Sequence, residues 1–143
     1  MNLKKAFSIV ELLIVMAVIA ILVSIAIPSF RAMQTEAWKA KAQGDVRVLK
    51  IALESYFKNH GSFPAVANYQ TTLLAETPPV LESTLYDPFG ASSTTAYSYV
   101  VSTSGKYYAV YSVGYGGTGA LTVADTGAVA TTAGTPIYAT NGR

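Results

Sequence analysis

The sequence predicts an α+β fold in which one long N-terminal helix packs against a small antiparallel β-sheet. Residues 7–27 are apolar apart from Ser8, Glu11 and Ser24. Residues 29–59 are rich in good helix formers, and their apolar residues recur at three- and four-residue spacing. Residues 97–113 are rich in tyrosine and valine, which favour strands. A chain of 143 residues has room for one such helix and one small domain.

The apolar run is long enough to span a bilayer as a helix, which takes about 17–25 residues. Lys4 and Lys5 precede it, so this end is expected in the cytoplasm and the rest of the chain outside it. Glu11 is the one charged residue in the run, and a carboxylate there costs about 2.5–3.5 kcal/mol on insertion scales. Glu11 either snorkels to the headgroups or pairs with a cation. We favour a cationic partner, because ionisable residues inside membranes are usually functional.

Residues 4–30 resemble the N-terminus of type IV prepilins and type II secretion pseudopilins; their first part reads KKAFSIVELLIVMAVIAIL. In that family a prepilin peptidase removes a short basic leader, the new first residue is N-methylated, and the fifth is glutamate. The resemblance implies a leader at residues 1–6, cleavage between Ala6 and Phe7, and N-methylation of Phe7. It also implies that Glu11 pairs with the N-terminal amine of a neighbouring subunit. Ala6 stands where the family usually has glycine.

The resemblance divides the helix into a transmembrane and filament-core half at 7–28 and an amphipathic half at 29–60. Pro28 lies where the family commonly has proline, and we expect a helix kink there, because proline removes a backbone hydrogen bond and clashes with the preceding turn. Helical signals resume at once, so the helix is expected to continue to His60 and to end at Gly61. His60 is expected to interact with the helix dipole.

Residues 61–96 are predicted to connect the helix to the sheet, with a short helical turn at 72–75 and a turn at 85–90. Residues 97–143 are predicted to form the sheet and the C-terminal tail. Strands at 97–101 and 107–113 would pair as a hairpin, with further strands at 121–124 and 135–140. We expect the tyrosines to form a wall of the sheet against the helix rather than a conducting stack.

Residues 86–90, 97–99 and 106–114 are similar to the GspG family, the major pseudopilins of type II secretion. In that family the loop after the last of these strands binds calcium, and the resemblance implies Ser112 and Asp125 as candidate ligands. Calcium takes six to eight oxygens, whereas residues 114–126 contain one carboxylate. Asp125 is otherwise expected to be a turn residue. Because the chain has no cysteine, its C-terminal region must be held by packing or by an ion.

The resemblance implies a filament subunit, specifically a pseudopilin acting in protein export through a type II secretion system. A major type IV pilin for adhesion or motility is the alternative. The implied partners are copies of the chain, the prepilin peptidase, the inner-membrane assembly platform and minor pilins or pseudopilins. The implied location is the inner membrane, followed by a periplasmic or extracellular filament.

A third interpretation, from another class, is a single-pass membrane anchor carrying an exported binding domain, for which Glu11 would be dispensable. An enzyme is not expected, because the sequence has no Ser-His-Asp or Cys-His set, no histidine cluster and no phosphate loop. Nucleic-acid binding is not expected either. Removal of residues 1–6 would leave eight basic and eight acidic side chains and no basic patch.

Overall fold

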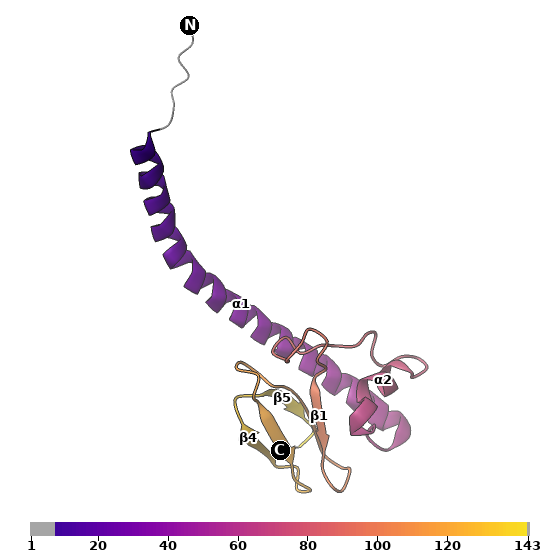
Figure 1. Ribbon diagram of the computed structural model, residues 1–143. Coiled ribbons are helices and arrows are strands. Elements are labelled where there is room, and N and C mark those ends of the chain that lie inside the picture. Colours follow the sequence, from indigo (N-terminus) through magenta and orange to yellow (C-terminus); the bar gives the residue numbers. More distant parts are fainter. Residues whose placement is uncertain (1–7, 143) are drawn as a thin grey trace. The chain divides into compact units, whose positions relative to one another are not determined.

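The computed structural model describes residues 8–142, in two units that meet between Glu36 and Ala37. Helix α1 (Ile9–His60) contributes its first part to one unit and its second part to the other (Figure 1). Ala6 and Phe7, the predicted cleavage and methylation residues, lie outside the described residues. The predicted long helix is confirmed, and so is its end. Gly61 adopts a φ of 71° and donates its N–H to the carbonyl of Phe57 at 2.7 Å.

The first unit consists of helix α1 up to Glu36. In the first turn of the helix, the N–H of Leu12 donates to the carbonyl of Ser8 at 3.2 Å. The hydroxyl of Ser24 donates to the carbonyl of Ile21 at 2.7 Å, so this polar group is satisfied within its own turn. The helix continues through Pro28, as predicted. The kink at Pro28 stays a prediction.

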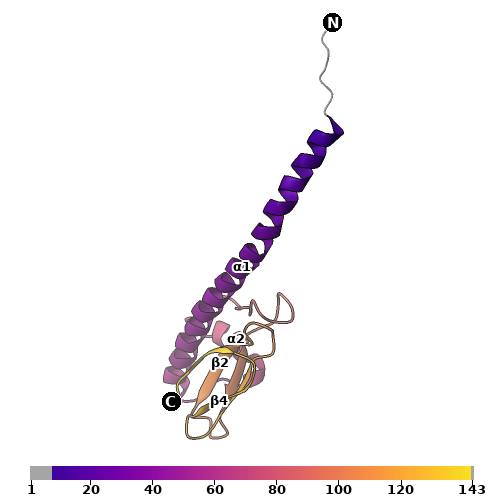
Figure 2. The same cartoon turned by 90° about the vertical axis from the view of Figure 1, so that its left-hand side faces the viewer.

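The second unit joins the rest of α1 to two antiparallel sheets (Figures 1 and 2). After α1 come a 3₁₀ turn, η1 (Val66–Asn68), and a short helix, α2 (Tyr69–Leu74), which overlaps the helical turn predicted at 72–75 but begins three residues earlier. The first sheet has the order β1 (Ser98–Val101), β2 (Tyr108–Ser112) and β5 (Ile137–Thr140). This confirms the hairpin. The strand predicted at 135–140 is also confirmed, as β5 at an edge of this sheet.

The second sheet pairs β3 (Ala120–Val123) with β4 (Val129–Ala133). Strand β3 was predicted at nearly these residues, but β4 was missed. The sequence of β4 is Val-Ala-Thr-Thr-Ala, and four of its five residues are exposed. It has no alternation of large apolar and polar side chains, so only its pairing with β3 identifies it as a strand.

The core lies between α1 and the three-stranded sheet. Helix α1 contributes buried residues at three- and four-residue spacing, namely Ala42, Val46, Leu49, Ala52 and Leu53. Tyr69 of α2, Tyr97 just before β1, Tyr99 of β1 and Tyr108 of β2 belong to the same cluster. The predicted tyrosine wall against the helix is therefore confirmed, and with it the α+β arrangement of one long helix against small antiparallel sheets.

The C-terminal region is held by strand pairing and side-chain hydrogen bonds. Strand β5 pairs with β2, and the Asn141 side chain extends this pairing. Its Oδ1 accepts the N–H of Tyr108 at 2.8 Å, and its Nδ2 donates to the carbonyl of Lys106 at 3.0 Å. These contacts tie the C-terminal residues to the first sheet without a disulfide.

Candidate functional site: the exposed apolar part of helix α1

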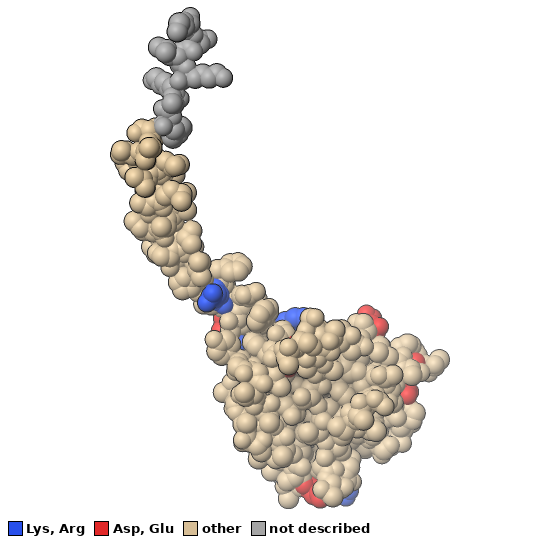
Figure 3. Space-filling view, viewed as in Figure 1, with Lys and Arg blue, Asp and Glu red and all other residues tan. Residues whose placement is uncertain are grey.

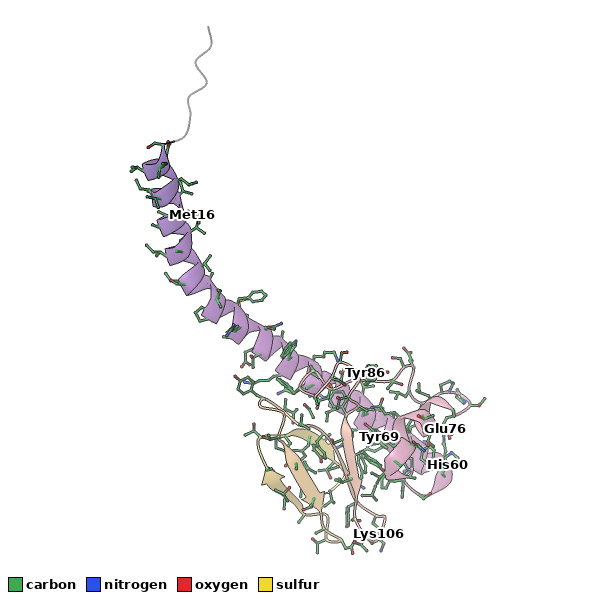
Figure 4. All side chains as sticks on the ribbon, viewed as in Figure 1. Met16, His60, Tyr69, Glu76, Tyr86 and Lys106 are labelled. Atoms are coloured by element: carbon green, nitrogen blue, oxygen red, sulfur yellow. The ribbon has the colours of Figure 1, made fainter. Side chains whose placement is uncertain are left out.

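The first part of α1 exposes large apolar side chains around its whole circumference (Figure 4). Those between Ile9 and Ile27 are 45–78 % exposed. On the face seen in Figure 3, uncharged side chains cover almost all of this part of the helix. A helix that is apolar all round requires a membrane or a protein core. Among the described residues, α1 is the one helix long and apolar enough to cross a membrane, and an 18-residue stretch of it has a mean hydropathy of 3.0.

Glu11 lies in the first turn of α1, where the N-terminal end of the helix dipole favours a carboxylate. It is the only charged residue between Ser8 and Phe30. It has no hydrogen-bond or ion-pair partner within residues 8–142. The helix therefore presents one unpaired carboxylate near its start on an otherwise apolar surface. Once that surface is buried, the carboxylate needs a cation from outside residues 8–142.

The second unit contains a buried carboxylate whose role the sequence did not reveal. Asp87 was predicted only as a turn residue, yet it is 3 % exposed. Its Oδ1 accepts the N–H of Phe89 at 2.9 Å and the hydroxyl of Ser112 at 2.7 Å, and its Oδ2 accepts the N–H of Val113 at 2.8 Å. Asp87 therefore fastens the connecting region to the end of β2. The Asp-Pro dipeptide was a signal for the turn, but not for this contact.

The two candidate calcium ligands have different partners. The Ser112 hydroxyl is fully buried, donates to Asp87 and accepts the N–H of Gly114 at 3.1 Å. Asp125 is an exposed turn residue, and its Oδ1 accepts the N–H of Ser104 at 2.6 Å. This backbone hydrogen bond lowers the pKa of Asp125. Residues 8–142 contain no group of three acidic, histidine or cysteine side chains that could hold a metal ion.

His60 makes contacts that were not predicted. Its Nε2 lies 2.9 Å from the Oε2 of Glu76, and its ring stacks on Tyr56 at a centroid distance of 4.2 Å (Figure 4). The end of α1 is thereby tied to the segment after α2. Trp38 of α1 packs edge-to-face with Phe89, and their ring centroids are 5.9 Å apart. The His60–Glu76 and Trp38–Phe89 contacts join residues distant in sequence, and no local pattern indicates them.

Residues 1–27 match the family described as the prokaryotic N-terminal methylation motif. The chain is 34 % identical over 65 residues to the type IV major pilin protein PilA of Myxococcus xanthus. This match covers 46 % of this chain and 30 % of that protein. It is 33 % identical over 69 residues to a fimbrial protein of Neisseria meningitidis, 45 % of this chain and 38 % of that protein. It is 34 % identical over 68 residues to the type IV major pilin protein PilE1 of Neisseria gonorrhoeae, and this match covers 44 % of this chain and 38 % of that protein. No solved structure matches.

The matched stretch spans between 30 and 38 % of the length of these relatives. The comparisons confirm the methylation motif and the similarity to type IV pilins, which are structural subunits and not enzymes. They do not distinguish a secretion pseudopilin from a surface pilin. An apolar helix with this motif is typical of a membrane-anchored N-terminus.

Proposed function

We propose that this chain is a structural subunit of a type IV pilin-like filament. The observation that carries the proposal is helix α1, which is exposed and apolar all round in its first part and bears one unpaired carboxylate, Glu11, within the methylation motif. Transfer of such a surface out of water is favourable, first into the membrane and then among the helices of other subunits. A plain membrane anchor would have the same favourable burial without the free-energy cost of placing a carboxylate in the membrane.

In this proposal the prepilin peptidase cleaves between Ala6 and Phe7, and Phe7 is then methylated. The freed amine of Phe7 in one subunit pairs with Glu11 of its neighbour in the apolar core. An unpaired buried charge is strongly unfavourable, whereas a paired one is tolerated, so the pair selects one register of assembly. The partners are further copies of the chain, the inner-membrane assembly platform and minor pilins or pseudopilins. The subunit begins in the inner membrane and ends in a periplasmic or extracellular filament.

Two finer versions of this function remain. The likeness of residues 86–90 and 106–114 to the major pseudopilins supports a subunit that acts in protein export. The names of the relatives, which are type IV major pilins and fimbrial proteins, support a surface pilus for adhesion or motility. Deletion of the chain distinguishes them. Loss of secreted proteins with intact surface filaments supports the first, and loss of sheared surface filaments with intact secretion supports the second.

The filament proposal is tested by the intact mass and N-terminal fragmentation of the protein taken from its native membrane or sheared filament fraction. We expect a chain that begins at N-methylated Phe7. A chain that still begins at Met1, in a membrane that contains an active prepilin peptidase, would contradict the pairing of Phe7 with Glu11. That result would favour the single-pass anchor with an exported binding domain.

A further inference from the structure

The acidic side chains of the second unit have partners within the molecule, with one exception. Asp45 pairs with Lys41, Glu54 with Lys50 and Glu76 with His60. Asp87 and Asp125 accept backbone N–H groups, as described above. Glu82 is exposed and has no hydrogen-bond or ion-pair partner within residues 37–142. Its side chain is therefore available to a cation outside the described residues.

Glu82 borders a groove of about 280 Å³ on one flank of α1. The groove is lined by Val48 of α1 and by residues 80–83 and 85. Val48 is 48 % exposed although it lies on a helix that packs against a core. This flank therefore combines an unpaired carboxylate with uncovered apolar surface.

A second groove, of about 310 Å³, lies on the other flank of α1, against the edge strand β5. Helix α1 lines it with Gln43, Val46, Arg47 and Lys50, and β5 lines it with Ile137, Tyr138 and Ala139. Arg47 is exposed and has no ion-pair partner among the described residues, and Tyr138 is 46 % exposed. This flank resembles the first in combining uncovered apolar surface with an unpaired charge. The charge here is positive, whereas that of the first flank is negative.

We propose that these two grooves meet in the lateral contact between neighbouring copies of this chain, with Glu82 of one copy facing Arg47 of the next. The proposal rests on the proposed function as a filament subunit, and it adds a contact outside the apolar part of α1. The occupant is a second copy because the two grooves complement each other in charge. The α1 residues that line the basic groove lie between Gln43 and Lys50, and Val48, which lines the acidic groove, falls within the same stretch of about 10 Å along the helix. The contact therefore joins α1 helices side by side with little axial offset.

The contact is heterologous, because two different surfaces meet. Each added copy leaves one acidic groove and one basic groove free, so the contact continues from copy to copy and gives an open helical polymer rather than a closed dimer. The ridge of α1 between the grooves is uncharged at Ala40, Gly44 and Ile51, and Ile51 is 63 % exposed.

Cysteine cross-linking tests the contact directly, because the chain has no cysteine of its own. The full-length double variant Glu82→Cys and Arg47→Cys is treated with a short bis-maleimide in the native filament fraction. We expect a ladder of covalent oligomers on a denaturing gel, and monomers alone for either single variant. Dimers from a single variant would show an isologous contact and overturn the proposal. A pair of Lys106→Cys and Arg47→Cys is the matched control, because Lys106 lines neither groove, and it should give no ladder.

Charge reversal supplies a second readout. Glu82→Lys or Arg47→Glu should each lower the amount of polymer by roughly tenfold, because like charges then face each other. The double reversal should restore the polymer, whereas Glu82→Lys with Lys58→Glu should not. Unchanged thermal unfolding of each variant separates assembly from folding. If the wild-type chain polymerises but neither single reversal lowers the yield, the lateral contact is wrong and the filament function stands. If the wild-type chain forms no polymer in its native membrane, the filament function itself fails.

Discussion

The hydroxyl of Ser112, in the last position of β2, donates a 2.7 Å hydrogen bond to the buried carboxylate of Asp87, in the connecting region. The same carboxylate accepts the N–H groups of Phe89 and Val113. Residues 25 positions apart are thus held by one side chain. A carboxylate that accepts several hydrogen bonds in a buried position makes each of them stronger than a neutral bond.

Asp87→Ala is therefore expected to destabilise the second unit by about 3 kcal/mol or more, since buried N–H and hydroxyl donors lose a charged acceptor. Ser112→Ala removes one hydrogen bond and should cost about 1–2 kcal/mol. Thermal unfolding of the detergent-solubilised chain, followed by near-ultraviolet circular dichroism, measures both effects. Glu82→Gln changes an exposed, unpartnered carboxylate and serves as the control. Equal stability of Asp87→Ala and this control would contradict the fastening role of Asp87.

Gly119 is predicted to tolerate no larger residue. A Cβ atom at this position would lie 2.2 Å from the carbonyl oxygen of Val113, so the backbone would have to move. We expect Gly119→Ala to destabilise the protein by about 2 kcal/mol or more. Gly44 in α1 is the matched control, because a Cβ atom there meets nothing within 4 Å. Gly44→Ala should stabilise the isolated chain by up to about 1 kcal/mol through helix propensity. Chemical denaturation in detergent compares the two variants.

Loss of the hydroxyl should affect the stability of the protein differently at two buried tyrosines, Tyr97 and Tyr99. The Tyr97 hydroxyl donates to Oδ2 of Asp45 at 2.8 Å, so Tyr97→Phe should cost about 1–2 kcal/mol. The Tyr99 hydroxyl is buried and has no partner among the described residues. Tyr99→Phe should therefore leave stability unchanged or raise it by about 1 kcal/mol. Chemical denaturation of the two variants side by side checks the difference, and a larger loss for Tyr99→Phe would refute it.

Stability should fall at alkaline pH. Burial raises the pKa of Tyr69, Tyr97, Tyr99 and Tyr108 above the ordinary value near 10. Above pH 10 the unfolded chain loses these protons while the folded chain keeps them, so the unfolded state binds fewer protons and stability declines. Below pH 10 these tyrosines are protonated in both the folded and the unfolded chain, so their contribution to stability is fully present there. Each such tyrosine contributes a slope of about 1.4 kcal/mol per pH unit above its unfolded pKa. Spectrophotometric titration should show these tyrosines ionising only as the protein unfolds.

Glu11→Ala should abolish polymer formation while improving membrane insertion, which on insertion scales gains about 2.5–3.5 kcal/mol. Polymer is lost because the amine of the neighbouring Phe7 then lacks its counter-charge. Ser24→Ala, in the same half of α1, removes a hydroxyl already bonded within the helix and should leave assembly unchanged. Sedimentation of native membrane and filament fractions measures the polymer. Normal polymer from Glu11→Ala would favour a plain membrane anchor.

The sequence alone determined the features that depend on local patterns. The apolar run, the helix that ends at Gly61 and the hairpin of β1 and β2 follow from hydrophobic periodicity, helix propensity and turn residues. The methylation motif and the unusual position of Glu11 are likewise visible in neighbouring residues.

The tertiary structure alone decided the contacts between residues far apart in the chain. The pairing of β4 with β3, the Asp87–Ser112 hydrogen bond, the His60–Glu76 pair and the closure of the tail by Asn141 join such residues. Their side chains are ordinary turn, helix-end or loop residues by sequence. A buried polar group takes whichever partner the packed fold brings within hydrogen-bond distance, and that proximity is set by chain topology rather than by the adjacent sequence.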